Sequence, residues 1–353
     1  MSQNITVLVD DQDSRINYLC PSLKQDVAGS YSNNTWTTIQ SADCSNGWFE
    51  YVFYGTGVHI AASVAHPTQD VSVKLDDGHF IPQPGNGHYD SPVLADGRHT
   101  VTYAIGNVSL VPVFDYLTVD AGPSTPLSGS TLIVDDSDTT IKYSGSWTTS
   151  PPHPLSFDYS TSLYKNTTHW SSTVGDTIEF KFTGTSVSVY GLFSNISAGG
   201  NISATYSIDG NSTTQFVPQG SLDSVPMAQL FHADLQAGNH TLSVNVTSIT
   251  SPRALGVDFI AYNSSVTSVA ALPGYTQSPI QTASTNHHSS ASSSIHAWII
   301  TAIVLGVVLV LGLGLGGVLF ARRRARRTEE KVSDPLSREF YLAHLDLGSW
   351  TGT

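Results

Sequence analysis

Short runs in which apolar and polar residues alternate fill most of the chain up to residue 263. In VSVKLDDG, the side chains of Val71, Val73 and Leu75 share one face of an expected strand, and the Asp-Gly pair after them favours a turn. The run ATYSIDGN, from Ala204, has the same alternation and the same Asp-Gly turn. No stretch before Ala297 keeps a 3.6-residue period. The pattern therefore predicts an all-β fold of β-sandwich or jelly-roll type.

The alternating segments occur twice, in the same order. VDDQDSRINY, from Val9, and VDDSDTTIKY, from Val134, agree at six of ten positions. Further matched segments are NTWTT with GSWTT, FYGTGVHI with FTGTSVSV, LADGRHTVTY with LQAGNHTLSV, and VFDYLTV with GVDFIAY. The sequence thus predicts two copies of one domain, residues 1–121 and 131–263, joined by a Pro/Gly/Ser-rich linker at 122–130.

A run of 24 residues without charge, AWIITAIVLGVVLVLGLGLGGVLF, covers residues 297–320. At about 1.5 Å per residue, a helix of this length crosses a hydrocarbon core of roughly 30 Å, so we expect one transmembrane helix. Residues 264–296 before it are rich in Ser and Thr, which is typical of a disordered stalk, and residues 321–353 form a tail. Gly312 and Gly316 have the G-x-x-x-G spacing that lets two spans pack closely. Membrane lipid and a homodimer through the helix are therefore expected partners.

Charge and glycosylation motifs predict the orientation of this span. Five arginines, from Arg322 to Arg327, follow it, and positive residues favour the cytoplasmic side. N-x-S/T motifs all lie on the other side, at Asn4, Asn33, Asn107, Asn166, Asn195, Asn201, Asn211, Asn239, Asn245 and Asn263. We therefore expect a single-pass plasma-membrane glycoprotein with an extracellular N-terminus and a cytoplasmic C-terminus. The opening residues, MSQNITVLVDDQDS, do not resemble a signal peptide, which leaves two alternatives: an absent or unconventional signal, or a span that acts as a late reverse anchor.

The net charge argues against one class of partner. Residues 1–320 contain eight Lys or Arg against 23 Asp or Glu, and charged residues make up only 12% of the chain. An acidic surface repels phosphate backbones, so no nucleic-acid partner is expected.

Two cysteines allow one disulfide, Cys20 to Cys44. Compared with copy two, copy one carries about 14 extra residues between Tyr18 and Trp36, and the two cysteines bracket this insertion. The alternative is two buried free thiols, but the predicted extracellular location favours the bridge.

Two sets of aspartates suggest candidate sites. Asp10, Asp11 and Asp13 recur as Asp135, Asp136 and Asp138, so their closely spaced oxygens are a candidate structural calcium site; capping of turns is the alternative. No other cofactor is expected. In the last strand of each copy, Asp115 and Asp258 take apolar positions, where a carboxylate needs a partner, so contact with a ligand or a structural hydrogen bond is expected.

Aromatic residues are the third candidate. Trp36, Trp147 and Tyr143 offer flat faces on which sugar C–H surfaces stack, although a tryptophan in a repeated strand also suits a core.

The repeated VDDxDxxIxY start, the YSIDG turn and the G-x-H-T-L-x-V strand, together with the stalk, span and arginine layout, resemble a family. The chain is similar to uncharacterised fungal, chiefly basidiomycete, single-span membrane proteins with tandem ectodomains like galactose-binding jelly rolls. The resemblance covers residues 5–263 and implies a carbohydrate-module-like fold without established catalytic residues. Copy one departs from the pattern because it lacks the Ser-Gly before its Trp36.

These observations lead to a functional expectation. We expect a non-catalytic cell-surface protein, not an enzyme, whose ectodomain binds carbohydrate, with cell-wall polysaccharide as its partner. The alternatives are a structural or adhesive protein without a specific glycan ligand, and a glycoside hydrolase-like enzyme that uses two carboxylates across a cleft.

Overall fold

The computed structural model describes residues 5–26, 31–40, 44–106, 111–155, 162–194, 202–216 and 227–272. These residues form strands, turns and short 3₁₀ helices, so the all-β prediction is confirmed. They lie in one compact unit, Met1–Ile280. The predicted span, the tail and most of the stalk lie outside the described residues, and within the described part no helix is long and apolar enough to cross a membrane.

The folded structure extends past the predicted domain end at residue 263. Strand β19 (Ala254–Ser264) is followed by the 3₁₀ helix η5 (Val269–Ala271). Val269 and Leu272 are buried in the hydrophobic core, so the first residues of the predicted stalk belong to the fold. The alternating pattern ends at residue 263, which is why the sequence placed the boundary too early.

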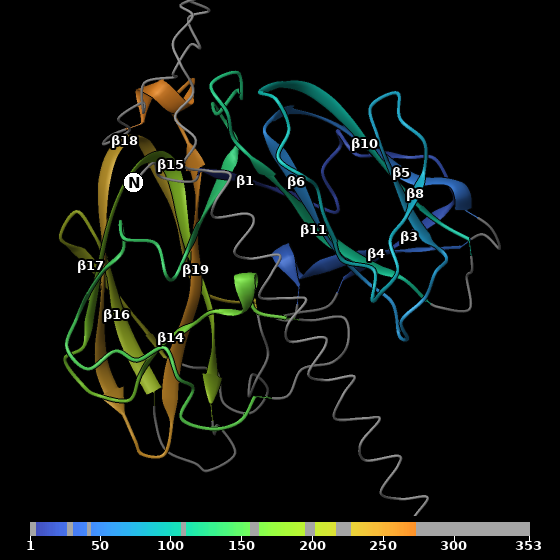
Figure 1. Ribbon diagram of the computed structural model, residues 1–353. Coiled ribbons are helices and arrows are strands. Elements are labelled where there is room, and N and C mark those ends of the chain that lie inside the picture. Colours follow the sequence, from blue (N-terminus) through green and yellow to red (C-terminus); the bar gives the residue numbers. More distant parts are fainter. Residues whose placement is uncertain are drawn as a thin grey trace, which may run out of the picture. The chain divides into compact units, whose positions relative to one another are not determined.

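Copy one contains two sheets, drawn in blue to teal in Figure 1. In one of them β1 (Thr6–Asp10) and β6 (Gly57–Ser63) flank β11 (Val113–Asp120). β3 (Ser22–Asp26), β4 (Thr35–Ile39) and β9 (Tyr89–Asp90) extend this sheet. The other sheet has the order β2 (Asn17–Tyr18), β5 (Cys44–Gly55), β10 (Gly97–Ile105), β7 (Val71–Leu75) and β8 (Ile81–Pro82).

Aromatic side chains fill the core of copy one. Trp48, Phe49, Tyr103 and Phe114 are all fully buried, and Phe49 stacks on both Tyr103 and Phe114, with ring centroids 5.3 and 4.2 Å apart. Phe49, Tyr51 and Phe53 alternate along β5 and point inward, which leaves the residues between them to face away from the core.

Copy two, green to orange in Figure 1, repeats this arrangement with longer strands. Its first strands are β12 (Thr131–Asp135), β13 (Lys142–Ser144) and β14 (His169–Ser171). β15 (Thr177–Ser194) pairs with both β18 (Ala228–Ile249) and β19. This one continuous strand is therefore the counterpart of both β5 and β6 in copy one. β16 (Ile202–Ile208) and β17 (Asn211–Phe216) complete the copy.

A glycine marks the corner between the two sheets in each copy. A Cβ on Gly55 would meet the carbonyl oxygen of Asp120 at 2.4 Å, and one on Gly184 would meet the carbonyl oxygen of Asn263 at 2.4 Å. Both glycines occur in the matched F-x-G-T segment, so the repeat preserves a backbone approach that no larger residue permits.

The two copies are joined by their first strands. β1 and β12 run antiparallel, with Val7 opposite Leu132, Thr6 opposite Ile133 and Leu8 opposite Thr131. Since Val7 and Leu132 occupy the same position in the repeat, the pairing is that of a two-fold symmetric dimer fused into one chain. Leu8 and Tyr116 of copy one share a buried cluster with Ile133, Tyr164, Tyr190, Met227, Phe259 and Ala261 of copy two.

The register of the strands corrects one match between the copies. Thr37 lies opposite Phe114, and His169 lies opposite Val257, the counterpart of Phe114. Trp36 therefore corresponds to Thr168 and not to Trp147. The identical letters WTT lie on strand β4 in copy one and in the segment after β13 in copy two, so they do not occupy equivalent positions.

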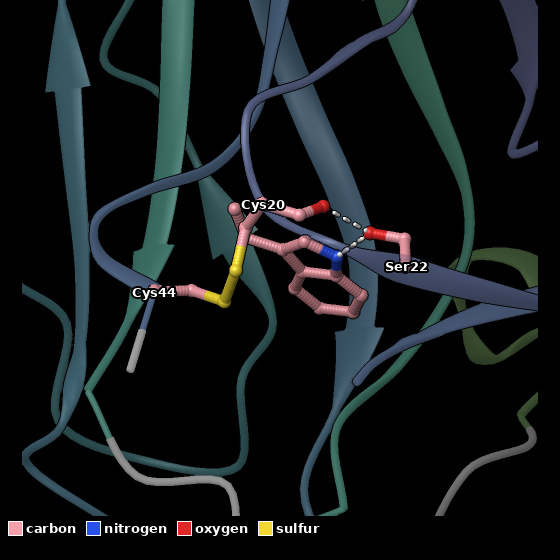
Figure 2. Close-up of a disulfide and its surroundings, with 4 residues drawn as sticks. Cys20, Ser22 and Cys44 are labelled. Carbon is pink, nitrogen blue, oxygen red and sulfur yellow. Dashed lines mark hydrogen bonds between the residues drawn. A yellow bond between two sulfur atoms is a disulfide. The ribbon is translucent and has the colours of Figure 1, made fainter. Parts of the chain in front are cut away.

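This correction also removes the predicted insertion in copy one. The chain from Tyr143 to His169 is longer than that from Tyr18 to Thr37, so copy two has the longer connection. Cys20 and Cys44 nevertheless form a disulfide, with their Cα atoms 5.9 Å apart (Figure 2). Beside it, the Ser22 hydroxyl donates to the Cys20 carbonyl oxygen at 2.9 Å and accepts from the Trp48 indole at 3.1 Å.

Candidate functional site

The predicted aspartate sites lie inside each copy, where the first strand ends. In copy one, the Asp11 side chain is buried and accepts hydrogen bonds from the hydroxyls of Thr35 and Thr37. The Tyr18 hydroxyl donates to the Asp11 carbonyl oxygen at 2.7 Å. Burial raises the pKa of Asp11 to about 6, against the lowering effect of the two threonine hydroxyls. These contacts tie the end of β1 to β2 and β4.

Copy two repeats the arrangement with one change. Asp136 is buried and accepts from the Thr167 hydroxyl, but His169 replaces the second threonine and its Nδ1 contacts the Asp136 carboxylate. The Tyr143 hydroxyl donates to the Asp136 carbonyl oxygen at 2.9 Å, and its ring stacks on His169 at 4.1 Å. Burial raises the pKa of Asp136 as well. Tyr143, predicted as a sugar platform, is thus held half-buried by its own copy.

The carboxyls of Asp115 and Asp258 are also hydrogen-bonded within their own copies. Their side chains are buried, and each accepts a backbone N–H of a 3₁₀ turn: Ser32 at 2.8 Å in η1 (Ser32–Asn34), and Tyr164 at 3.1 Å in η3 (Tyr164–Asn166). Burial raises the pKa of both carboxyls well above the usual range. The expected partner of each carboxyl is therefore a turn of its own copy, and neither carboxyl reaches the surface of the described structure.

The remaining calcium candidates turn toward local partners. The Asp13 carboxylate pairs with the Arg15 guanidinium at 2.6 Å, and Asp138 accepts from the backbone N–H and hydroxyl of Thr140. The Asp10 carboxylate accepts from the Asn33 side chain at 2.9 Å, and that of Asp135 accepts from the Thr167 hydroxyl at 3.2 Å. Among the described residues, no group of three or more His, Cys, Asp or Glu has a geometry that would hold a metal ion. Calcium binding stays a prediction, and the contacts match the alternative of turn capping.

Trp36 and Trp147 have different environments. Trp36 is half-buried on β4 beside Tyr31, with ring centroids 5.9 Å apart. Trp147 packs against the core of copy two, contacts Tyr143 edge-on, and donates its indole N–H to the Thr177 carbonyl oxygen at 3.1 Å. The two tryptophans do not form a repeated platform.

Five predicted glycosylation sites lie at exposed positions: Asn33, Asn166, Asn211, Asn239 and Asn245. Asn263 is half-buried and its side-chain oxygen accepts from the Thr131 hydroxyl. Asn4, Asn107, Asn195 and Asn201 lie outside the described residues.

An exposed aromatic side chain lies on the five-stranded sheet of copy one. The solvent-facing side of this sheet, which we call the outer face of copy one, carries the side chains of Glu50, Val52, Tyr54, Lys74, Arg98 and Thr100. Val52 is 38% exposed and Tyr54 43% exposed, and both have large side chains on strand β5, where it pairs with β10. Arg98 lies directly opposite Tyr54, and Thr100 lies opposite Val52. An aromatic ring thus stands beside hydrogen-bonding groups on an open surface.

Among the described residues, the equivalent face of copy two carries no aromatic side chain at the positions that correspond to Val52 and Tyr54. Thr183 and Asn239 replace Tyr54 and Arg98, and the Thr183 hydroxyl donates to the Asn239 side-chain oxygen at 2.7 Å. Lys181, in the place of Val52, forms an ion pair with Glu179 at 3.4 Å. The copies therefore differ most in chemistry where they face solvent.

A second surface cluster surrounds His59 on β6. Its Nδ1 lies 2.6 Å from an Asp90 oxygen and its Nε2 lies 3.0 Å from an Asp120 oxygen, while His88 contacts the same Asp90 oxygen at 3.1 Å. The hydrogen bond to Asp120 raises the pKa of His59. The same contact, reinforced by the positive charge, lowers the pKa of Asp120, and His59 also lowers that of Asp90. The His59 ring thus bridges two carboxylates.

The sequence analysis did not single out Tyr54, Arg98 or His59. It favoured residues that recur in both copies, and these three occur in one copy only. The signal for Tyr54 was nevertheless present: in FEYVFYG, alternation that buries Phe49, Tyr51 and Phe53 turns Val52 and Tyr54 toward solvent.

No protein-family model matches the chain. A sequence relative, "A type blood alpha-D-galactosamine galactosaminidase" from Flavonifractor plautii, is 26% identical over 264 residues. The match covers 72% of this chain but 22% of the relative, so the chain corresponds to a small part of that protein.

Solved structures that resemble the chain do so at low identity. A tandem CBM22 domain from Paenibacillus barcinonensis Xyn10C is 9% identical, with a TM-score of 0.27, over 75% of this chain and 98% of that one. The plant receptor-like kinase FER is 12% identical, with a TM-score of 0.24, over 72% of this chain and 95% of that one. A two-domain esterase active on acetylated mannans is 14% identical, with a TM-score of 0.31, over 42% of this chain and 40% of that one. Overlaps this shallow carry no argument about function.

These comparisons correct one expectation from the sequence. The chain was expected not to be an enzyme, but the sequence relative is named as a galactosaminidase. That expectation is therefore wrong. The absence of familiar hydrolase motifs, on which it rested, does not exclude activity on glycans. The resemblance to fungal membrane proteins stays a prediction.

Proposed function

We propose that the chain binds carbohydrate through the outer face of copy one. The observation that carries the proposal is the exposed Tyr54 ring beside the guanidinium of Arg98 on an open sheet. An aromatic face stacks on the C–H side of a sugar ring, and neighbouring charged groups bond to its hydroxyls. The galactosaminidase relative supports a glycan as the ligand class. In its more specific form, the proposal is that a membrane-anchored protein binds polysaccharide of a cell wall.

Binding of the full-length protein to a panel of immobilised glycans tests the proposal. The wild type should retain at least one glycan, and Tyr54→Ala should lose it, since a stacked aromatic contributes on the order of 1 kcal/mol to a weak complex. The matched control is Thr183→Ala, at the equivalent position of copy two, which should bind as the wild type does. Retention of the glycan by folded Tyr54→Ala would place the binding surface elsewhere.

A second candidate is cleavage of a glycosidic bond, favoured by the name of the sequence relative. Such a reaction needs a proton donor and a carboxylate on either side of the bond. The His59 cluster places a histidine ring, whose pKa is raised by its contact with Asp120, between the carboxylates of Asp90 and Asp120. Release of nitrophenol from a nitrophenyl α-galactosaminide by the full-length protein tests it. Turnover that survives His59→Gln would exclude this cluster, and no turnover by the wild type would exclude the substrate.

A further inference from the structure

We propose that the outer face of copy one selects glycans whose sugars carry a carboxylate. This inference rests on the proposed function, because it concerns the ligand of the same surface. The observation behind it is that Arg98 is an exposed cation for which the described residues supply no ion pair, next to the exposed ring of Tyr54 on that face.

The other cations of copy one each have a partner within the copy, which is a carboxylate for Arg15 and an aromatic ring for Lys24 and Lys74. Arg15 pairs with Asp13 at 2.6 Å, Lys24 lies 6.0 Å from the centroid of Tyr18, and Lys74 lies 5.5 Å from that of Phe80. Among the described residues Arg98 forms no ion pair, although acidic residues outnumber basic ones almost threefold in residues 1–320. An unpaired guanidinium in so acidic a chain is free to bind an anion.

The charge of Arg98 acts on the Asp76 carboxylate, but this carboxylate already accepts hydrogen bonds from other groups. Its two oxygens accept from the His99 ring at 2.9 Å and from the Thr100 backbone N–H at 2.8 Å. Asp96, two residues before Arg98, accepts from the backbone and hydroxyl of Ser124. Asp76 is therefore bonded to β10 and Asp96 to the linker, and neither carboxylate forms an ion pair with Arg98 in the described structure.

The geometry of the pair suits an acidic sugar. Tyr54 and Arg98 lie directly opposite each other on adjacent strands, where Cβ atoms are about 5 Å apart. A sugar ring stacked on Tyr54 places a ring substituent within reach of the guanidinium. The planar guanidinium donates two parallel hydrogen bonds to a carboxylate, a match that a hydroxyl does not provide. Stacking would supply affinity, and the ion pair would supply selectivity.

The pair of an exposed aromatic ring and an arginine is found on the outer face of copy one and not at the equivalent positions of copy two. Its equivalent face carries the predicted glycosylation sites Asn239 and Asn245, both exposed, and its one lysine there is paired with Glu179. Attached glycans would cover that face, whereas no N-x-S/T motif lies on the outer face of copy one.

Calorimetric titration of the full-length protein with two probes tests the inference. The first probe is an oligogalacturonide, and the second is the same oligosaccharide with its carboxyl groups reduced to alcohols. We expect the acidic probe to bind about tenfold more tightly, since hydrogen bonds to charged groups are the stronger ones. Arg98→Gln should abolish the difference and Arg98→Lys should retain part of it. Lys181→Gln in copy two, the matched control, should leave it unchanged.

The outcomes separate this inference from the proposed function. Equal binding of both probes, lost in Tyr54→Ala, would overturn the selectivity and leave carbohydrate binding in place. A preference for the acidic probe that survives Arg98→Gln would also overturn it. If neither probe binds while a neutral glycan of the panel does, the inference fails and the proposed function stands; if no glycan binds at all, both fail.

Discussion

At the scale of single residues, histidines with two acceptors are a repeated device of this protein. His99 contacts Asp76 through Nδ1 and the Ala95 carbonyl oxygen through Nε2, and His240 contacts Asp209 and the Gln236 carbonyl oxygen in the same way. A neutral imidazole has one N–H and satisfies one acceptor, whereas the imidazolium satisfies both. The carboxylate contact accordingly raises the pKa of both histidines.

These histidines predict how stability depends on pH. A histidine whose pKa is raised by folding stabilises fully below its unfolded value of 6.5, and the contribution is lost as pH rises through the folded pKa. Urea denaturation of His240→Gln should therefore show a deficit against the wild type that is largest near about pH 5 and shrinks above neutrality. His66→Gln, at an exposed position, serves as control. A deficit that grows with rising pH would contradict this account.

Residues also show where sequence reasoning succeeded. Asp115 and Asp258 take positions of the last strand at which apolar residues are expected, and each carboxyl has the hydrogen-bond partner that this position predicts. The predicted disulfide between Cys20 and Cys44 is also present. The partners themselves were out of reach, because Ser32 and Tyr164 are brought there by turns whose position depends on tertiary packing. The Trp36 and Trp147 match failed because a three-letter identity carries no information on strand register.

At the scale of elements, the disulfide anchors the start of β3 to the start of β5 in copy one only. The double variant Cys20→Ser, Cys44→Ser should lose roughly 3 kcal/mol of unfolding free energy, the value of the chain-entropy model for a loop of this length. The buried Trp48, whose indole bonds to Ser22 beside the bridge, reports the unfolding of copy one by its fluorescence. An unchanged denaturation midpoint would show that packing alone holds these strands.

Strand pairing explains why the fold was more predictable than the site. Alternation along β5, β10 and β15 specifies which side is buried, so the all-β class follows from local pattern. The outer face is defined by residues on three strands, β5, β7 and β10, and only their register shows that Tyr54 and Arg98 are neighbours. A sequence without a known register cannot supply that pairing.

At the scale of the whole molecule, the antiparallel pairing of β1 with β12 and the buried cluster around Leu8, Tyr116 and Ile133 join the two copies. We therefore expect one cooperative thermal transition for both copies in scanning calorimetry. Ile133→Ala, which truncates a buried side chain of that cluster, should cost about 2–4 kcal/mol and separate the transitions. Two well-resolved transitions in the wild type would contradict a coupled pair.

The two copies carry different side chains on their equivalent faces. Copy one presents Tyr54 and Arg98 to solvent, and copy two presents paired charges and predicted glycan attachment sites at the same positions. Under the proposed function copy one binds carbohydrate, and the predicted attachment sites Asn239 and Asn245 lie on copy two.

The central claim, that Tyr54 lies at the glycan contact, is tested most directly by NMR of protein with ¹³C-labelled tyrosine rings, titrated with a glycan that the protein retains. The Tyr54 signal, assigned by its loss in Tyr54→Phe, should shift as the glycan is added, while buried Tyr103 and Tyr206 should keep their positions. A titration that saturates binding and leaves the Tyr54 signal unmoved would contradict the account.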